Sequence, residues 1–281
     1  MFTRAAVLGS PVAHSLSPVL HTAAYTALGI ADTWSYERFE CGESELADFL
    51  AGCDDTWAGL SLTMPLKRVA LSLADEVNEP ANAVGGANTL VFHKGRRHAY
   101  NTDVAGIVAA LTEAGIERVR TATILGAGAT AASALAALRE LGATAPGAVT
   151  ALARSLDRAG DFTAAAQRMS AQVAVAPLSE LTEHLDVDMV VSTLPAGAAD
   201  GHAAAIAASG AAVFDVVYAP WPTVLGSRAR EAGATVVGGF PMLLHQAVFQ
   251  VELMTGQCGI PVEDMRAAGE AELAQRTAAA Q

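Results

Sequence analysis

The 281-residue sequence predicts an α/β protein with two domains. Short runs of β-type residues alternate with helical patterns almost throughout, as in βαβ units. A second series of apolar strands begins at Thr121 and carries a glycine-rich turn, and the length leaves room for two cores. We expect the break near Asp103, so that residues 1–103 and 240–281 form one domain and residues 104–239 the other.

The first domain is predicted to contain three βα units followed by a hairpin. The strands RAAVLGS, WSYERFE and WAGLSLT alternate with helices that begin at Ser17, at Ser44 and after Pro65. The strands ANTLVFH and RRHAYNTD flank a turn at residues 93–95 and predict a hairpin. The polar tail after Gly269 is expected to be frayed.

The second domain is predicted to hold a parallel sheet covered by helices on both faces. After a helix at 104–113, short apolar runs recur as TATILGAG, VTALAR, VAVAPL, DMVVSTLP, AAVFDVVY and TVVGGF. The pattern FPMLLHQAVFQVELMTG then predicts a long helix after Gly239. This helix cannot continue the sheet, so we expect it to return to the first domain.

Composition limits the kinds of partner. Lys and Arg total 17 against 29 Asp and Glu, a net charge of −12, so a nucleic-acid surface is not expected and an anionic ligand needs locally placed donors. Cys41, Cys53 and Cys258 show no C-x-x-C spacing and are expected to be reduced, buried thiols of a cytoplasmic protein. Neither a signal peptide nor an apolar segment of about 18 residues indicates a membrane.

The stretch SPVAHSLSPVLHTAAY places two serines at a helix start. Ser17 precedes proline and is predicted to cap the helix, whereas Ser15 has no such structural role. Two hydroxyls at a helix N-terminus, where N–H groups and the helix dipole favour negative charge, predict a cradle for a carboxylate. His14, His21 and His245 lack the spacing of metal ligands, so no metal is expected.

The segment ILGAGATAASAL predicts a dinucleotide site. Gly126, Gly128 and Ala131 follow the G-x-G-x-x-G/A pattern between a strand and a helix. The first glycine permits the tight turn and the second lets the backbone approach a pyrophosphate. The alternative is an ordinary glycine-rich βα loop.

The end of the next strand indicates which dinucleotide is bound. Arg154 and Ser155 stand where an NAD site has an acidic residue, and Arg158 follows one turn later. A guanidinium can donate two hydrogen bonds to a 2′-phosphate, so the expected cofactor is NADP(H). The alternative is that Arg154 is an ordinary solvated arginine.

Polar residues gather at the strand ends of the first domain. They are Thr63, Lys67, Asn88, Asn101 and Asp103. An ammonium beside a carboxylate can give or take a proton at a carbonyl oxygen, so Lys67 and Asp103 predict a carbonyl/alcohol redox step beside a nicotinamide. For Lys67 alone, the alternative is a solvated lysine at a helix start.

Nine ordered segments resemble the shikimate dehydrogenase family over roughly residues 8–255. They are GSPVAHSLSP, GLSLTMPLK, GGANTL, NTDVAG, GAGATA, ARSLDRA, STLPAG, DVVYAPWPTVL and GGFPMLLHQA. The resemblance implies two α/β domains around a cleft, an N-terminal substrate-binding and catalytic domain and a C-terminal Rossmann-type, doubly wound NADP domain. It implies NADPH-dependent, reversible reduction of 3-dehydroshikimate to shikimate in aromatic amino-acid biosynthesis, by a monomer or homodimer.

The resemblance also implies residue roles. The substrate carboxylate is held by Ser15 and Ser17 with help from Tyr218, and Lys67 and Asp103 form the catalytic pair. The remaining substrate contacts are Thr63, Asn88 and Gln246, and both members of the catalytic pair also touch the substrate. The cofactor residues are Gly126, Ala127, Gly128, Ala129 and Thr130 at the pyrophosphate, Arg154, Ser155 and Arg158 at the 2′-phosphate end, and Gly239 and Met242 at the nicotinamide.

Three positions depart from the family pattern. Ser61 and Thr22 stand where asparagine is usual and are expected to loosen substrate-side hydrogen bonds, and Ala153 replaces an asparagine near the adenosine end. Two other functions remain open: an NAD-linked quinate/shikimate dehydrogenase, against which Arg154 argues, and a metabolite-sensing protein without catalysis.

Overall fold

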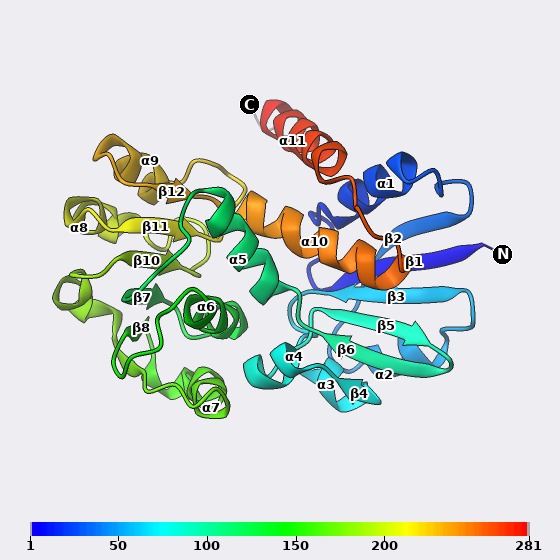
Figure 1. The fold of residues 1–281 in the computed structure, drawn as a ribbon, viewed down its shortest axis with the longest axis horizontal. Coiled ribbons are helices and arrows are strands. Elements are labelled where there is room, and N and C mark those ends of the chain that lie inside the picture. The colour runs from blue at the N-terminus through cyan, green and yellow to red at the C-terminus, as the bar shows by residue number, and fades with distance from the viewer. Residues whose placement is uncertain (1, 280–281) are drawn as a thin grey trace. The chain divides into compact units, whose positions relative to one another are not determined.

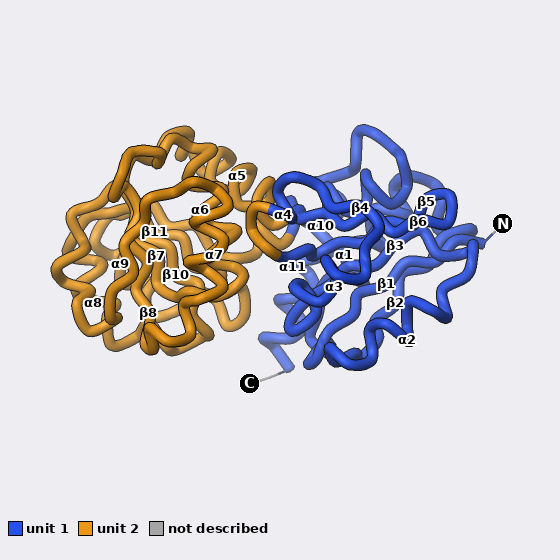
Figure 2. The backbone as a smooth tube through the Cα atoms, turned by 90° about the horizontal axis from the view of Figure 1, so that it is seen from below, with its two compact units in different colours: residues 1–82, 86–102, 244–281 blue, residues 83–85, 103–243 orange. Residues whose placement is uncertain are grey.

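A computed structural model describes residues 2–279 and confirms the α/β fold. The chain divides into two compact units (Figure 2): unit 1 comprises residues 1–82, 86–102 and 244–281, and unit 2 comprises residues 83–85 and 103–243. The boundaries differ slightly from those expected. Asp103 begins helix α5 and belongs to unit 2, and residues 83–85 join unit 2 because Arg168 donates to the carbonyl oxygens of Ala83 and Val84.

Unit 1 is built on a mixed six-stranded sheet in the order β2-β1-β3-β5-β6-β4 (Figure 1). The strands are β1 Thr3–Gly9, β2 Trp34–Glu40, β3 Trp57–Leu62, β4 Glu76–Val77, β5 Thr89–His93 and β6 Arg96–Tyr100. Strand β1 runs parallel to β2 and β3, whereas β5 pairs antiparallel with β3 and β6. Lys94 and Gly95 both have positive φ and form the two-residue turn that confirms the predicted hairpin.

The helices of unit 1 flank this sheet, and the last of them packs on the first. They are α1 Ser17–Ala27, α2 Leu46–Ala51, α3 Val69–Leu73, α4 Glu79–Val84, whose last residues belong to unit 2, α11 Val262–Ala279 and the part of α10 Gly239–Thr255 from residue 244 onward. Most of α10 thus belongs to unit 1. One core cluster unites Leu8, Leu60 and Leu62 of the sheet with Leu46 and Ala70 of the helices.

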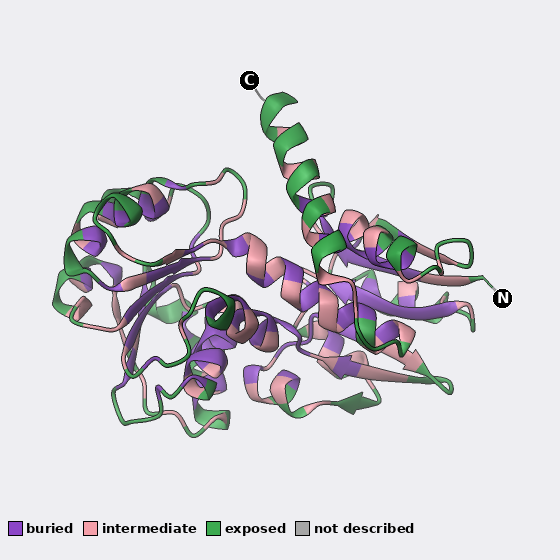
Figure 3. Ribbon diagram, turned by 45° about the horizontal axis from the view of Figure 1, so that its top comes forward, coloured by how far each residue is buried: buried purple, intermediate pink, exposed green. Residues whose placement is uncertain are grey.

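The C-terminal tail is helical, and the expectation that it frays after Gly269 is wrong. Helix α11 continues to Ala279, although much of its surface is exposed (Figure 3). Alanine and glutamate favour the helix, and Arg276 Nε donates to Glu272 Oε1 at 2.7 Å one turn earlier. Arg276 also donates to the carbonyl oxygen of His14, which attaches the end of the helix to the rest of unit 1.

Unit 2 holds a fully parallel six-stranded sheet in the order β12-β11-β10-β7-β8-β9. Its strands are β7 Ala122–Leu125, β8 Val149–Ala153, β9 Ala174–Pro177, β10 Met189–Ser192, β11 Ala212–Asp215 and β12 Val236–Val237. The order reverses between β7 and β10, which is the position where doubly wound sheets bind ligands at the carboxyl ends of their strands.

Helices cover both faces of this sheet, as predicted. They are α5 Asp103–Glu113, α6 Ala129–Glu140, α7 Gly160–Arg168, α8 Ala203–Ser209 and α9 Val224–Glu231, with short 3₁₀ turns at Leu156–Arg158, Leu178–His184 and Asp200–His202. Alternate strand residues point to opposite faces: Ile124 packs in the cluster with α5, α6 and α7, and Leu125 in the cluster with α8 and α9. The central strands are accordingly almost wholly buried (Figure 3).

The structure bears on two expectations from composition, one about membrane-spanning segments and one about the cysteines. Within residues 2–279, no helix combines the length and apolar character needed to cross a bilayer. The three cysteines are unpaired, but only Cys41 is buried, whereas Cys53 is half-buried and Cys258 is exposed. The expectation of three buried thiols is therefore wrong, because Cys258 lies in the polar loop between α10 and α11.

Candidate active site

The loops that follow β1 and β3 meet at one edge of the unit 1 sheet. Ser10 N–H donates to the Met64 carbonyl oxygen at 2.9 Å, and Thr63 N–H donates to the Leu8 carbonyl oxygen at 2.9 Å. Gly9 permits this approach, since a Cβ there would collide with the Thr63 side chain. The loop that carries Ser15 and the loop that carries Thr63 and Lys67 therefore lie side by side.

At the start of α1, the serine that bonds to the helix backbone is Ser15 and not Ser17. Helix α1 begins at Ser17 itself, whose side chain makes no capping bond, and Ser15 Oγ accepts from Ser17 N–H at 3.2 Å. A serine hydroxyl commonly bonds to the backbone two residues on, and the prediction that Ser17 caps the helix is wrong for this reason. The Ser17 side chain is buried and hydrogen-bonds with Tyr36.

A buried chain of hydrogen bonds runs inward from Tyr36. Its hydroxyl donates to Ser61 Oγ at 2.6 Å, and Ser61 Oγ donates to Gln250 Oε1 at 2.8 Å. Gln250 Nε2 then donates to Thr89 Oγ1 at 2.9 Å and to the Asn88 carbonyl oxygen at 3.2 Å. Ser61 is thus fully engaged, although a looser set of hydrogen bonds was expected at this departure from the family pattern.

Asn88 is the centre of this buried network. Its Nδ2 donates to Thr102 Oγ1 at 2.9 Å and to Gln246 Oε1 at 3.2 Å, and its Oδ1 accepts from Thr102 N–H at 2.8 Å. The side chain is 2% exposed. The structure therefore brings together two predicted substrate residues, Asn88 and Gln246, through a direct contact.

His21 belongs to the same network. Its ring stacks on Tyr36 with 3.8 Å between centroids, and Nε2–H donates to Gln250 Oε1 at 3.3 Å. Nδ1 is buried without a hydrogen-bond partner, and burial lowers the pKa of His21 to about 3. Among the residues that the structure describes, no group of three or more His, Cys, Asp or Glu side chains could hold a metal ion.

The two predicted catalytic residues lie in different units. Lys67 follows β3 in unit 1 and is half-buried, and its carbonyl oxygen accepts from Ala87 N–H at 2.7 Å, next to Asn88. Asp103 is buried at the start of α5 in unit 2, where a negative charge is favoured by the helix dipole. Their pairing stays a prediction.

Unit 2 contains a cavity of about 490 Å³ at the carboxyl edge of its sheet. The lining residues are Gly126, Ala127, Gly128, Ala153, Arg154, Ser155, Arg158, Thr193 and Leu194. The structure therefore brings the glycine-rich loop and the two arginines into one cavity, beside the reversal in strand order between β7 and β10. Ala129 and Thr130 begin helix α6 directly after the loop.

The glycine-rich loop has the shape that a pyrophosphate needs. Gly126 has a φ of 113°, and a Cβ there would collide with Thr193 Oγ1. A Cβ on Gly128 would meet nothing within 4 Å, so the space in front of this residue is open. The N–H groups of the first turn of α6 lie next to it, and a helix N-terminus favours an anion.

Arg154 and Arg158 provide the positive charge of this cavity. Both side chains are exposed, and within residues 2–279 neither guanidinium pairs with a carboxylate. Ser155 precedes the 3₁₀ turn that carries Arg158, and Ala153 lines the cavity with little exposure of its own. Guanidinium groups that are not used by the protein can donate to a phosphate.

The loop of Tyr218 is fixed at both ends within unit 2. Asp215 accepts from Thr223 Oγ1 at 2.8 Å and from Val217 N–H at 3.2 Å, and burial raises the pKa of this carboxyl. Gly239 N–H donates to the Val217 carbonyl oxygen at 3.1 Å. Gly239 thus lies beside the Tyr218 loop and does not line the cavity.

Met242 is a further predicted cofactor residue outside the cavity lining. It is 9% exposed and packs in the core cluster that contains Phe214.

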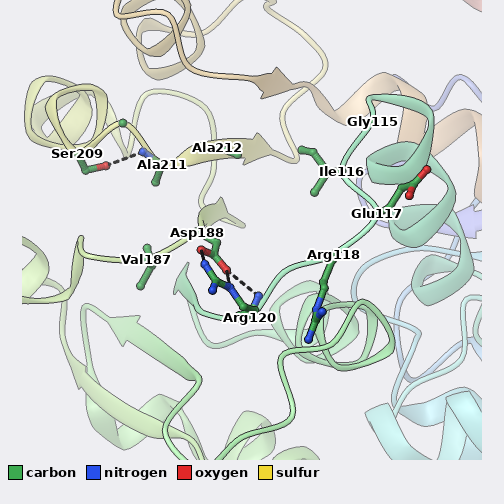
Figure 4. A pocket seen from close by; sticks show the side chains of 11 residues that line it. Gly115, Ile116, Glu117, Arg118, Arg120, Val187, Asp188, Ser209, Ala211 and Ala212 are labelled. Atoms are coloured by element: carbon green, nitrogen blue, oxygen red, sulfur yellow. Dashed lines mark hydrogen bonds and ion pairs between the residues drawn. The ribbon is translucent and has the colours of Figure 1, made fainter.

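A second cavity of about 710 Å³ lies at the opposite, amino edge of the unit 2 sheet (Figure 4). It is larger, but ligands of doubly wound sheets bind at the carboxyl ends of the strands. Of its two arginines, Arg120 is already engaged: its Nη2 donates to Asp188 Oδ1 at 3.1 Å, and its N–H to Asp188 Oδ2 at 2.8 Å (Figure 4). We therefore assign the site to the smaller cavity.

Several residues at these sites have no role predicted from the sequence. Thr193 and Leu194 line the cavity, and their position at the end of the predicted strand DMVVSTLP is a signal that could have suggested them. Gln250 lies one helical turn after Gln246 on α10, which also signals a shared face. Tyr36 gives no local signal, because only the tertiary fold brings it to Ser61.

Family models match both ends of the chain. A model described as "Shikimate dehydrogenase substrate binding domain" matches residues 7–90. A second, described as "Shikimate 5'-dehydrogenase C-terminal domain", matches residues 239–268. Together they span parts of both units.

Comparisons of the whole chain with known proteins give the same family as the two family models. The sequence is 35% identical to "Shikimate dehydrogenase (NADP(+))" of Synechococcus sp. (strain JA-3-3Ab), covering 96% of this chain and 94% of the relative. The structure resembles the crystal structure of Mycobacterium tuberculosis shikimate dehydrogenase, with 42% identity, a TM-score of 0.86 and coverage of 96% and 99%. It also resembles the Thermus thermophilus shikimate 5-dehydrogenase in complex with NADP(H) and shikimate, with 32% identity, a TM-score of 0.82 and coverage of 96% and 99%.

Proposed function

The chain belongs to the shikimate dehydrogenase family, and we propose that it catalyses the reversible, NADPH-dependent reduction of 3-dehydroshikimate to shikimate in aromatic amino-acid biosynthesis. The observation that carries the proposal is the unit 2 cavity, where a glycine-rich loop meets two arginines. We expect unit 1 to bind the substrate and unit 2 the cofactor. We also expect a monomer or homodimer that acts in the cytoplasm, where a thiol such as Cys258 stays reduced.

The cavity residues fit NADPH. The loop from Gly126 to Thr130 would hold the pyrophosphate, in the open space before Gly128. Arg154 and Arg158 would hold the 2′-phosphate, with Ser155 beside them. Gly239 and Met242 are proposed to lie next to the nicotinamide. When bound, NADPH supplies the hydride for the carbonyl carbon of the substrate.

Unit 1 is proposed to bind the substrate together with Tyr218 and Asp103 of unit 2, and the substrate carboxylate is proposed to meet neutral donors. Ser15 and Ser17 would hold the carboxylate together with Tyr218, and the ring oxygens would contact Thr63, Lys67, Asn88, Asp103 and Gln246. A ring hydroxyl would replace the direct hydrogen bond that Asn88 Nδ2 donates to Gln246 Oε1 and would bond to both side chains instead. The buried network behind these two amides keeps their orientation fixed.

Lys67 is proposed to supply the proton of the reduction. As the carbonyl carbon gains a hydride, the carbonyl oxygen gains negative charge and takes a proton from the Lys67 ammonium. The new O–H bond completes the alcohol, and the neutral amine regains its proton from solvent. Asp103 would orient the ammonium and stabilise its charge before the transfer.

One absorbance experiment tests the function against its alternatives. Mixing the protein with shikimate and NADP should raise the absorbance at the nicotinamide band, whereas NAD or quinate should give a much slower rise. A faster rise with NAD would favour the NAD-linked quinate/shikimate dehydrogenase. Shikimate binding measured by calorimetry without any rise in absorbance would favour the metabolite-sensing protein and contradict the proposal.

A further inference from the structure

Three charged side chains hold the loop of residues 10–16, which carries Ser15. Arg38, on β2, donates from Nη1 to the Ala13 carbonyl oxygen. Arg276, near the end of α11, donates from Nη1 to the His14 carbonyl oxygen at 2.7 Å. Glu40, also on β2, accepts from Val12 N–H at 3.2 Å. Two consecutive carbonyl groups directly before Ser15 thus each bind a guanidinium.

We propose that Arg38 and Arg276 are positioning residues that set the affinity for the substrate carboxylate by holding Ser15 in its binding orientation. This inference rests on the proposed function and deepens it. Neither arginine lies near Ser15 in the sequence, and neither belongs to the segments that resemble the family's functional motifs.

The peptide geometry explains how Arg276 acts on Ser15. The His14 carbonyl and the Ser15 N–H belong to one planar peptide unit and point in opposite directions. Fixing the carbonyl oxygen on Arg276 therefore also fixes the Ser15 N–H, which donates to the Val12 carbonyl oxygen at 2.9 Å. The Ser15 hydroxyl is in turn oriented by Ser17 N–H.

Arg276 is itself well oriented for this contact. Its Nε donates to Glu272 Oε1 at 2.7 Å, while Nη1 reaches His14, so one planar guanidinium serves both partners. The side chain is 30% exposed. This contact gives the last turns of α11 a function, because without them the His14 carbonyl would lose its guanidinium.

The two guanidiniums also reduce the electrostatic repulsion that the substrate carboxylate would meet near this loop. A carboxylate near residues 13–15 would meet the negative ends of the Ala13 and His14 carbonyl dipoles. Each guanidinium offsets one of these dipoles at its oxygen. In a chain with a net charge of −12, such local cations matter more than the overall field.

Kinetics of single and double variants test the inference. Arg38→Gln and Arg276→Gln should each raise the KM for shikimate about three- to tenfold, because a partly misplaced serine loses only part of a charged hydrogen bond. The kcat and the KM for NADP should stay within about twofold of the parent. Arg276→Lys should recover only part of the loss, since it keeps the charge and a donor but lacks the planar group that binds Glu272 and His14 together. Arg266→Gln, which removes an equal charge from the same helix, is the matched control.

A second set of variants asks whether Arg276 acts through Ser15. In a Ser15→Ala background, Arg276→Gln should raise the KM for shikimate by less than about twofold, because coupled positions are not additive. Full additivity, or an Arg38→Gln/Arg276→Gln protein with the parent's KM, would overturn the inference while leaving the proposed function intact. A parent protein that does not oxidise shikimate with NADP would overturn the proposed function, and the inference with it.

Discussion

The two candidate binding regions are built in opposite ways. In unit 1, the amides and hydroxyls near the predicted substrate site are buried and hydrogen-bond to one another, as Asn88 does with Gln246 and Thr102. In unit 2, the proposed cofactor cavity is lined by loop backbone and by the exposed guanidiniums of Arg154 and Arg158. The polar side chains of unit 1 are held in place by hydrogen bonds to one another, whereas the shape of a loop places the groups that line the unit 2 cavity.

This difference predicts different costs of substitution. Removing a member of a buried network leaves its partners without hydrogen bonds, so binding and folding stability should change together. Removing an exposed cation changes ligand affinity while folding stability stays nearly constant. Substitutions at Lys67, Gln250, Arg154 and His21, in order from the largest expected effect to the smallest, test this contrast.

Substitution of Lys67 should lower the catalytic rate without lowering folding stability, although Lys67 belongs to unit 1. Lys67→Ala should lower kcat by about 10²- to 10⁴-fold, the range for a positioned acid or base, with a much smaller change in KM. The melting temperature should stay close to that of the parent, because the side chain is only half-buried. Lys94→Ala, in the turn between β5 and β6, is the control. A Lys67→Ala protein within threefold of the parent kcat would remove Lys67 from the mechanism.

Gln250 should show the strongest link between stability and binding. It is 1% exposed, and Gln250→Leu would remove the four buried hydrogen bonds that Gln250 makes with Ser61, Thr89, the Asn88 carbonyl oxygen and His21. Denaturant titration should show a loss of about 2–4 kcal/mol in the free energy of unfolding, since each of the four lost hydrogen bonds contributes about 0.5–1.5 kcal/mol. The KM for shikimate should rise as well.

Gln257→Leu provides the matched comparison for that variant. Gln257 follows α10 and is exposed, so the same substitution there should change the unfolding free energy by less than about 0.5 kcal/mol. Equal losses at the two positions would show that the buried network does not stabilise unit 1.

The sequence predicts the cofactor region better than the substrate region, and the reason is physical. The turn, the helix start and the arginine proposed to bind phosphate all lie between Gly126 and Arg158, so local spacing carries the information. Residues at the ends of adjacent parallel strands also meet predictably, which places Arg154 beside the glycine loop.

The unit 1 network depends on contacts that spacing cannot reveal. Ser61 and Gln250 are separated by 189 positions, and Ser61 and Tyr36 approach each other only through the packing of the strands. The mistaken role of Ser17 has a similar cause: a serine before proline favours a cap, but Ser15 already satisfies the Ser17 N–H.

Arg154 and Arg158 should control cofactor choice without affecting stability. Arg154→Ala should raise the KM for NADPH and leave NADH nearly unchanged, because only NADPH loses a charged partner. The double variant Arg154→Ala/Arg158→Ala should lower the NADPH-to-NADH ratio of kcat/KM by about 10- to 100-fold, as expected for one charged hydrogen bond of about 1.5–3 kcal/mol. All assays need one ionic strength, since salt screens phosphate contacts. A double variant with the parent's ratio would exclude this strand end from phosphate binding.

His21 should make unit 1 sensitive to mild acid. Burial lowers its folded-state pKa to about 3 from the ordinary 6.5, so the unfolded chain takes up the proton first. The stability that His21 contributes is full above pH 6.5 and is lost as the pH falls towards 3. Between pH 7 and pH 5.5 this loss amounts to about 1 kcal/mol of unfolding free energy.

The histidine contribution is measured as a difference between proteins. His21→Leu should be less stable than the parent at pH 7, because it loses the bond to Gln250, but its stability should fall about 1 kcal/mol less between pH 7 and pH 5.5. His14→Leu, at an exposed position, should keep the parent's slope. Denaturant titrations at both pH values measure all three proteins, and equal slopes for the parent and His21→Leu would show that the network tolerates a charged imidazole. That result would contradict the contrast between the two regions at His21, which is fully buried. Protonation adds a proton to Nδ1, and a network whose hydrogen bonds are fixed by mutual contacts leaves no acceptor for it.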